Sequence, residues 1–444
     1  MSGFKFWSVA ALLSLSSISA PLFAQSPHES LSMTLDECLE YAKENSITLQ
    51  KARLSIEDSQ SDQVSAKGAF LPSLSAYVGQ DFNTNPTNTD VNANKTSYTG
   101  SYGFSLSMTL YSGGSNRAKL LQSGISNQIA NLELDEFENS LEVSITQTYV
   151  EILYAMEQIL AAEYTLELSK KNLERGVVYL EVGSINQVDY AQLESAVASY
   201  EYDLVVCQSQ LTSLYVELKH LLEISQDIEF SVVQPEISAE LLSEYIPSLN
   251  DVYSVAVESR PEIASTQLSV DAAELDVTIA KAGYLPSLSL SAGTGLNHNT
   301  SSAYTFGSQL QNNFNTSVGV NLSVPIFSKF QNRTAVAKSE NSVRTASLNL
   351  TQTQKDLYQT IETLHNNTTT AQAKYSVSQN LLETSKKSMD LTTQQYEVGM
   401  KNTIELLTEQ DNYQQAYQDF LVNKYQLILN KALLNYYKTN LIKL

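Results

Sequence analysis

The chain has 444 residues, enough for two or three ordinary domains. Its formal charge is -21, with 48 acidic residues against 27 Lys and Arg, which argues against nucleic acid or anionic lipid as the main partner. After residue 25, no apolar run approaches the ~18 residues that a transmembrane helix needs. The sequence therefore predicts a soluble protein, or one that meets a membrane through strands.

Residues 1–24 have the pattern of a secretory signal peptide. Lys5 supplies a positive start, residues 9–15 form an apolar stretch, and residues 20–24 offer a cleavage site before Gln25. The apolar stretch is too short for a stable membrane-spanning helix, which argues against the alternative of a membrane anchor. Gln25 is not a cysteine, so a lipid-anchored lipoprotein is not expected. We expect the protein to leave the cytoplasm.

The rest of the sequence is a tandem duplication. Residues 66–75 recur as residues 280–289 at an offset of 214, and Asn116-Arg117 recurs as Asn332-Arg333 at an offset of 216. Further motifs along more than a hundred residues keep the second offset, which chance matches would not do. The repeat predicts four parts after the signal peptide: a first copy (34–225), a linker or equatorial segment (226–248), a second copy (249–437) and a C-terminal tail (438–444).

Each copy opens with an amphipathic helical region, residues 34–69 and 249–283. Pro261 interrupts the second region, and we expect it to begin the longer helix there, where its missing N–H is harmless. Pro72 and Pro286 are expected to end the two regions before a strand, because proline cannot continue a helix and favours extended geometry in the residue before it.

Two strands are predicted next in each copy. In residues 101–110, large apolar side chains alternate with Ser, Gly and Thr, and residues 287–296 and 317–326 show the same period of two. The first strand, residues 73–82, is less regular because Gln80 interrupts its apolar face. A soluble β-sandwich has the same period.

Two observations favour a membrane barrel over a sandwich. The second face of the three regular strands carries Ser, Gly, Thr and Asn without charge, as suits a wet lumen, and each segment has about the ~10 residues of a tilted transmembrane strand. The Asn-, Thr- and Ser-rich residues 83–97 and 297–311 are predicted to be long external loops. One chain would supply four strands, which cannot close a barrel, so several chains must share one in a cyclic assembly.

Very long helices follow the strands. Residues 113–178 and 330–396 lack proline and carry apolar residues at helical spacing, which predicts helices on the order of 100 Å long. The pattern resumes at residues 189–222 and 405–437, so Gly183 and Gly399 mark the tips of two helical hairpins. Gly113-Gly114, at the strand-to-helix turn, is interpreted as a backbone turn rather than a ligand site.

With these features in view, the chain resembles the TolC-like outer membrane efflux protein family over residues 34–437. The resemblance rests on three motifs that occur in this order in both copies. They are Leu-Pro-Ser-Leu before a strand (71–74 and 285–288), the strand-to-helix turn (110–114 and 324–328, which includes Phe327 and Ser328), and the hairpin tip (179–183 and 396–399).

This resemblance implies an α+β membrane protein in the outer membrane that extends into the periplasm. Three chains would form a twelve-stranded barrel in outer-membrane lipid and a tunnel of coiled-coil helices closed at the periplasmic end. The tips, with Gly183, Asp189, Gly399 and Glu405, would meet a periplasmic adaptor protein that links the duct to an inner-membrane pump. The chain departs from the family pattern after Ser328, where Lys329-Phe330 replaces Gly-Gly.

The aperture is the least defined of the predicted sites. Glu405 matches the first acidic position that often rings the family's aperture, but Thr408 stands where a second acid often lies. Three copies of Glu405 near the threefold axis would repel one another or bind cations and so influence opening. Alternatively, Glu405 is an ordinary acid at a helix start, favoured by the helix dipole. Asp189 is interpreted as a helix-start cap.

No catalytic, cofactor-binding or metal site is predicted. The four histidines lie far apart, and no Gly-x4-Gly-Lys phosphate loop occurs, so energy must come from a partner. Cys38 and Cys207 match no metal or redox spacing and are interpreted as two unpaired thiols, with a disulfide as the alternative.

The sequence as a whole predicts a passive outer-membrane exit duct for small molecules such as drugs and toxic compounds. One alternative is the outer-membrane component of type I protein secretion. Another, of a different class, is a soluble periplasmic coiled-coil scaffold whose strands form a sandwich.

Overall fold

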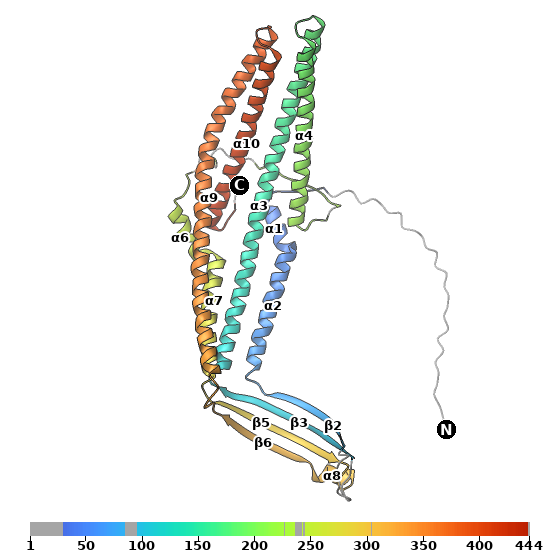
Figure 1. Ribbon diagram of the computed structural model, residues 1–444, viewed down its shortest axis with the longest axis vertical. Coiled ribbons are helices and arrows are strands. Elements are labelled where there is room, and N and C mark those ends of the chain that lie inside the picture. The colour runs from blue at the N-terminus through green and yellow to red at the C-terminus, as the bar shows by residue number, and fades with distance from the viewer. Residues whose placement is uncertain are drawn as a thin grey trace, which may run out of the picture.

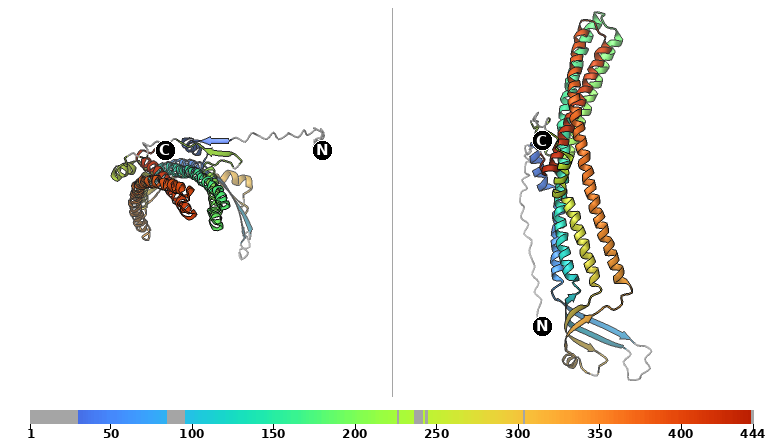
Figure 2. Two further views of the ribbon diagram at one scale, coloured as in Figure 1. Left: turned by 90° about the horizontal axis from the view of Figure 1, so that it is seen from above. Right: turned by 90° about the vertical axis from the view of Figure 1, so that its left-hand side faces the viewer.

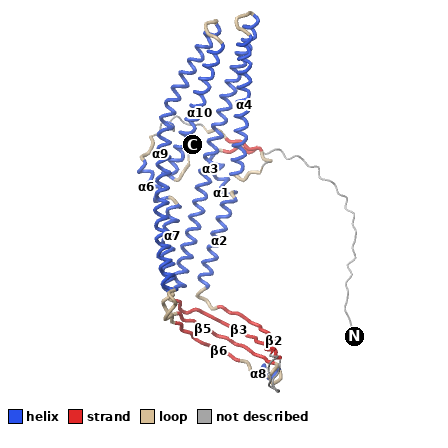
Figure 3. Tube along the Cα trace, viewed as in Figure 1, coloured by secondary structure: helices blue, strands red, loops and turns tan. Residues whose placement is uncertain are grey.

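The structure is a computed structural model that describes residues 30–84, 96–225, 227–235, 242, 245–302 and 304–442. The predicted signal peptide, residues 1–24, lies outside them. The described residues form an elongated body with a four-stranded sheet at one end and two helical hairpin tips at the other (Figure 1). Helices make up most of its length, and a small pair of strands crosses near the middle (Figure 3).

Both copies of the repeat are built from the same four helices. An 11-residue helix precedes one of 22 residues, and a 67-residue helix precedes a hairpin arm of 35 or 37 residues. The first copy contains α1 (Leu35–Asn45), α2 (Ile47–Gly68), α3 (Ser115–Glu181) and α4 (Gln187–Leu221). The second contains α6 (Leu249–Ser259), α7 (Pro261–Ala282), α9 (Gln331–Glu397) and α10 (Thr403–Thr439). At ~1.5 Å per residue, α3 and α9 are each about 100 Å long, which confirms the long helices expected from the sequence.

The helical region that opens each copy is broken at the same repeat position. Arg260 separates α6 from α7, and Pro261 is the first residue of α7, as expected. Ser46, 214 residues earlier, separates α1 from α2. Its hydroxyl accepts a hydrogen bond from the Leu49 N–H at 3.4 Å. The first break thus depends on a serine cap rather than on proline, which explains why no helix breaker marks it in the sequence.

The sheet joins the two copies edge to edge. Its strands β2 (Ser73–Thr84), β3 (Thr96–Ser112), β5 (Ser287–Asn299) and β6 (Asn315–Ser323) are antiparallel and lie in that order. The central seam, β3 with β5, pairs the second strand of one copy with the first strand of the other. The outer edges of β2 and β6 have no partner strand within the described chain.

The strand register gathers apolar side chains on one face of the sheet. Leu106 lies opposite both Leu74 and Ala292, and Ser105, on the other face, lies opposite Ser75. A β-bulge between Thr109 and Tyr111 shifts the pairing, so the alternation predicted for residues 101–110 ends one residue early. The bulge places Tyr111 opposite Leu288.

Nothing in the described chain covers the apolar face of this sheet. Val78 is 75% exposed and Val318 is 74% exposed. In a β-sandwich a second sheet would pack about 10 Å from this face, and the described residues contain no such sheet. The sandwich expected by the scaffold alternative is therefore absent from the described residues.

The predicted external loops differ from the structure. The second, residues 297–311, was expected to be a long loop, but β5 continues to Asn299 and a short helix, α8 (Phe306–Asn312), follows. The Thr305 side chain accepts from the Ser308 N–H at 3.4 Å and so caps α8. In the first loop, residues 83–97, both neighbouring strands extend into the range, and residues 85–95 lie outside the described residues.

A girdle, consisting of β1 (Ser30–Met33), α1, β4 (Glu229–Val232) and α6, packs against the long helices near mid-length (Figure 1). β1 pairs in parallel with β4, in the segment predicted only as a linker. The buried Tyr149 of α3 donates a hydrogen bond to the Val233 carbonyl and belongs to the same apolar core as Cys38 and Phe230. The girdle thus fixes the chain between the copies to the long helices.

Seen along its long axis, the chain traces an arc rather than a closed ring (Figure 2). None of the helices in the described ranges is long and apolar enough to cross a membrane. The arc shows that one chain forms a section of a curved wall (Figure 2).

Candidate functional site

The two hairpin tips have the same backbone turn. α3 ends at Glu181 and α9 at Glu397, and the glycines two residues later, Gly183 and Gly399, have φ of +74° and +77°. The N–H of the next residue donates back to the carbonyl five positions earlier, Ser184 to Tyr179 and Met400 to Gln395, both at 2.8 Å. Because this left-handed conformation strains any residue with a Cβ, both tips favour glycine.

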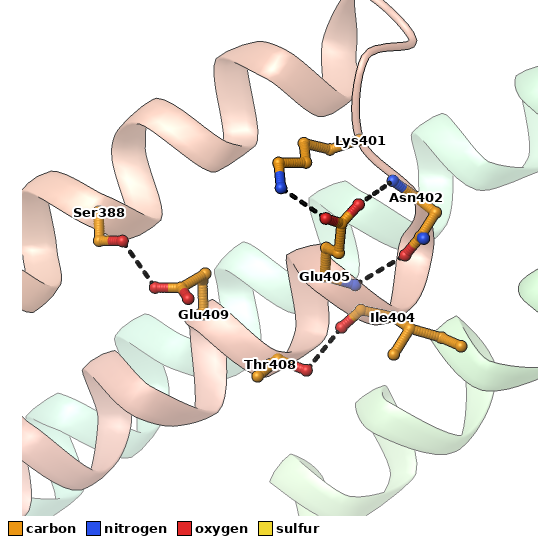
Figure 4. Close-up of polar contacts among 7 residues, drawn as sticks. All are labelled: Ser388, Lys401, Asn402, Ile404, Glu405, Thr408 and Glu409. Atoms are coloured by element: carbon orange, nitrogen blue, oxygen red, sulfur yellow. Dashed lines mark hydrogen bonds and ion pairs between the residues drawn. The ribbon is translucent and has the colours of Figure 1, made fainter.

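The second arm of each hairpin begins with a capping box. Asn402 caps α10: its side chain accepts from the Glu405 N–H at 2.9 Å, and the Glu405 carboxylate accepts from the Asn402 N–H at 3.0 Å (Figure 4). Asn186 and Asp189 form the equivalent pair at the start of α4, at 3.0 and 3.3 Å. Asp189, interpreted above as the cap, is instead the third helical residue, and Asn186 is the cap. The Asn-x-x-Asp and Asn-x-x-Glu spacing was the sequence signal for both asparagines.

Glu405 also forms an ion pair with Lys401, at 2.5 Å (Figure 4). The side-chain hydrogen bond from Lys401 and the backbone hydrogen bond from Asn402 hold the pKa of Glu405 below its ordinary value. Both side chains are exposed, so this pair contributes little to stability. The Thr408 hydroxyl donates to the Ile404 carbonyl of its own helix at 2.8 Å.

A cleft of ≈ 620 Å³ lies between the two tips. Asp189 from the first tip and Gly399 and Glu405 from the second line it, so the fold brings these three predicted residues together. Gly183 and Thr408 are not among its lining residues. Tyr179 and Tyr396 also line the cleft, with ring centroids 5.8 Å apart.

Behind the cleft, several polar ties join the first hairpin to the second. Arg175 of α3 forms an ion pair with Glu397 of α9 at 2.6 Å. Deeper in, the buried Asn172 donates to the buried Gln410 at 3.2 Å, and the Tyr200 hydroxyl donates to the Asp411 carboxylate at 2.6 Å. Burial, and then the hydrogen bond to Asp411, raises the pKa of Tyr200.

Four of these tied residues, Asn172, Tyr200, Gln410 and Asp411, were not predicted from the sequence. The tied residues lie more than two hundred positions apart, and no local spacing marks them. Only the docking of the two hairpins reveals them.

The strand-to-helix turns are alike in backbone but not in sequence. Gly113 and Gly114 have φ of +64° and +86°. The equivalent positions in the second copy, Lys329 and Phe330, also have positive φ, of 50° and 65°. The second turn therefore lies at these two residues, directly after Phe327 and Ser328. Pro72 and Pro286 each lie one residue before the first residue of a strand.

The two thiols are unpaired, as expected. Cys38 is buried in the girdle core and Cys207 is half-buried. Burial raises the pKa of Cys38 to about 12.

The sequence and structure were compared with known proteins. The sequence profile of the family described as outer membrane efflux protein matches residues 38–222 and again residues 252–435. Pyoverdine export outer membrane protein OpmQ of Pseudomonas aeruginosa is 25% identical over 393 residues, 85% of this chain and 78% of that protein. Outer membrane protein TolC of Vibrio cholerae is 22% identical over 424 residues, 92% of each chain.

A shorter match is the alkaline protease secretion protein AprF of P. aeruginosa, 24% identical over 183 residues, 41% of this chain and 37% of that protein. Among solved structures, the outer membrane protein VceC of V. cholerae superposes with a TM-score of 0.77 at 16% identity, covering 91% of this chain and 96% of that one. This likeness shows the fold. Together with the two profile matches, which follow the two copies of the repeat, it confirms the resemblance noted from the sequence. The chain therefore belongs to the outer membrane efflux protein family and is an exit duct of the outer membrane that extends into the periplasm.

Proposed function

We propose that three copies of this chain close their sheets into one twelve-stranded barrel in the outer membrane and their helices into one periplasmic duct. The observation that carries the proposal is the open sheet. All nine residues of β6 are exposed, the outer edges of β2 and β6 lack partner strands in the described chain, and the apolar face is uncovered. Unpaired backbone groups are not tolerated in lipid, so neighbouring copies must supply the missing strands.

Outer-membrane fractionation tests this proposal. We expect the protein to require detergent for extraction from the outer membrane and to run as a trimer that heating converts to monomer. A monomer or dimer recovered from the periplasmic fraction without detergent would instead support the scaffold alternative.

We further propose that the cargo is a small molecule delivered by an inner-membrane pump through a periplasmic adaptor. OpmQ, named for pyoverdine export, aligns with 85% of this chain, whereas AprF, named for alkaline protease secretion, aligns with 41%. Protein secretion is therefore the second candidate. Deletion of the gene should raise susceptibility to toxic compounds, with rescue by the intact gene. Loss of a secreted protein at unchanged susceptibility would favour the second candidate.

In this proposal the tips form the closed end of the duct and the contact with the adaptor. Their cleft carries Asp189, Gly399 and Glu405, and the ties behind it join hairpins that must separate for the end to widen. Adaptor binding would favour an open arrangement over a closed one, a two-state shift that requires tighter binding to the open state.

A further inference from the structure

The strand register inside each copy obeys the repeat. Ser73 lies opposite Ser107 in the first copy. Adding 214 to the first number and 216 to the second gives Ser287 and Ser323, which lie opposite each other in the second copy. The sequences agree without a gap, since Ser-Leu-Ser opens both β2 and β5 and Leu-Ser recurs at 106–107 and 322–323. The two offsets therefore describe backbone pairing as well as sequence.

Within its described residues, the chain contains one seam between β-hairpins, β3 with β5, and a closed barrel also needs a seam between neighbouring chains. In β3 with β5, the second strand of the first copy meets the first strand of the second copy. In a ring of chains, β6 of one chain meets β2 of the next, which is again the second strand of one copy against the first strand of the other. The internal seam is thus a template for the seam between chains.

We propose that β6 pairs with β2 of the partner subunit in the register of β3 with β5, an inference that rests on the trimeric barrel proposed above. The observed pair Leu106 and Ala292 becomes Leu322 and Val78 of the partner subunit, since 106 plus 216 is 322 and 292 minus 214 is 78. In the same way, the pair Tyr102 and Leu296 becomes Val318 opposite Phe82 of the partner subunit.

The side chains of the two edges fit this register. Leu322, Val318, Val78 and Phe82 are exposed in the single chain and belong to the apolar face. A slip of one residue would set that face against the serine and glycine face of the neighbour, so only slips by an even number of residues compete. The seam of β3 with β5 also sets apolar face against apolar face, and its register selects one of these even-numbered registers.

The register also assigns a partner to a segment that has none in the single chain. β3 continues to Ser112, with its bulge at Leu110, whereas β6 stops at Ser323. Ile326, the repeat equivalent of Leu110, is 96% exposed. Against β2 of the partner subunit, residues 324–328 should continue the strand with a bulge at Ile326. Pro325 then lies beside the bulge, where a sheet tolerates proline.

Disulfide crosslinking tests the register. The background carries Cys38→Ser and Cys207→Ser, and the test variant adds Leu322→Cys and Val78→Cys. Directly opposed residues lie within disulfide reach, whereas diagonal neighbours two residues away lie about 7–8 Å apart, beyond the usual range. The off-register controls therefore replace Val78→Cys with Ala76→Cys or Gln80→Cys. The variant Leu106→Cys with Ala292→Cys is the repeat-equivalent control inside one chain.

After oxidation in outer membranes, the test variant should give covalent dimers and trimers on non-reducing denaturing gels, and both off-register controls should stay monomeric. The internal control should form its bond at monomer mass. Chain-to-chain bonds with Ala76→Cys or Gln80→Cys, or none with Val78→Cys in a protein that still forms heat-sensitive trimers, would overturn the register. Absence of trimers from every variant would instead contradict the trimeric barrel itself.

Discussion

At the scale of single residues, the tie between Tyr200 and Asp411 joins hairpins from different copies through one hydrogen bond of 2.6 Å. A hydrogen bond to a charged group contributes about 1.5–3 kcal/mol. Tyr200→Phe removes the donor, so the closed tips should lose on the order of tenfold in population relative to open ones. Single-channel recording in lipid bilayers should show longer or larger openings. Tyr202→Phe, at a 69% exposed site on the same helix, is the matched control. Equal traces from both variants would argue against a gating tie.

Substitution of Glu405 distinguishes its two possible roles, an acid at the aperture and an ordinary acid at a helix start. If its carboxylate lies at the aperture of the proposed duct, Glu405→Ala should raise conductance and abolish block by divalent cations. Hydrogen bonding from Lys401 lowers the pKa of Glu405 from its ordinary value, so the wild-type block should persist through the ordinary titration range of a glutamate. It should vanish only as the pH falls through the lowered value. Asp189→Ala is the control from the other tip. Unchanged conductance and block in Glu405→Ala would leave only the capping role.

Gly103 illustrates packing in the sheet. A Cβ at this position would lie 2.6 Å from the Tyr77 hydroxyl and 2.5 Å from the Thr294 carbonyl oxygen, so the tyrosine ring occupies space that only glycine leaves. Gly103→Ala should destabilise the protein by about 1–3 kcal/mol and, since Tyr77 shares the serine and glycine face, push its ring toward the lumen.

The repeat supplies the control for this variant. Gly319 is the equivalent of Gly103, and its Cβ would meet only the Ser291 hydroxyl at 3.4 Å. Thermal unfolding of the detergent-purified protein should show a lower midpoint for Gly103→Ala than for Gly319→Ala, which has no tyrosine contact. A comparable loss in both variants would contradict the role of Tyr77.

At the scale of elements, the strand-to-helix turn shows how tertiary context overrides local preference. Lys329 and Phe330 have positive φ without being glycines, and a left-handed residue of this kind costs about 1–2 kcal/mol. Lys329→Gly should therefore raise the thermal midpoint. Gly113→Ala should lower it more than Gly114→Ala, because a Cβ on Gly113 would lie 2.7 Å from the Ala282 carbonyl oxygen, whereas one on Gly114 meets nothing within 4 Å. An equal drop in the thermal midpoint of both alanine variants would show that the left-handed backbone conformation, and not the contact with Ala282, determines the loss.

The elements that could be predicted are those with a long, uniform pattern. The 67-residue helices, the strands and the tip glycines each follow from spacing over many residues or from a proline or glycine at a fixed repeat position. The four-residue strands of the girdle are too short to show a period, and α8 depends on a single threonine cap. The hairpin ties could not be predicted, because their partners come from helices packed in three dimensions.

At the scale of the whole molecule, the girdle lies between the hairpin tips and the sheet (Figure 1). Cys38 is fully buried there, and burial raises its pKa to about 12, so its thiol should resist maleimide at pH 8. We expect Tyr200→Phe, which loosens the tips, to leave this protection unchanged. Mass spectrometry of labelled protein, with Cys207→Ser to remove the second thiol, would measure it. Faster labelling of Cys38 in the variant would show that opening spreads through the girdle.

The equal lengths of α3 and α9 limit how far either helix can change in length. Their sequences have diverged, yet both helices keep 67 residues. In the proposed trimer, loss of one helical turn from α3 alone would set three of six tips about 5.4 Å short of the others, and an end that must seal could not do so. Insertions and deletions within α3 and α9 should therefore occur in pairs, one in each copy. The common length of α3 and α9 is therefore a dimension that neither copy can change alone.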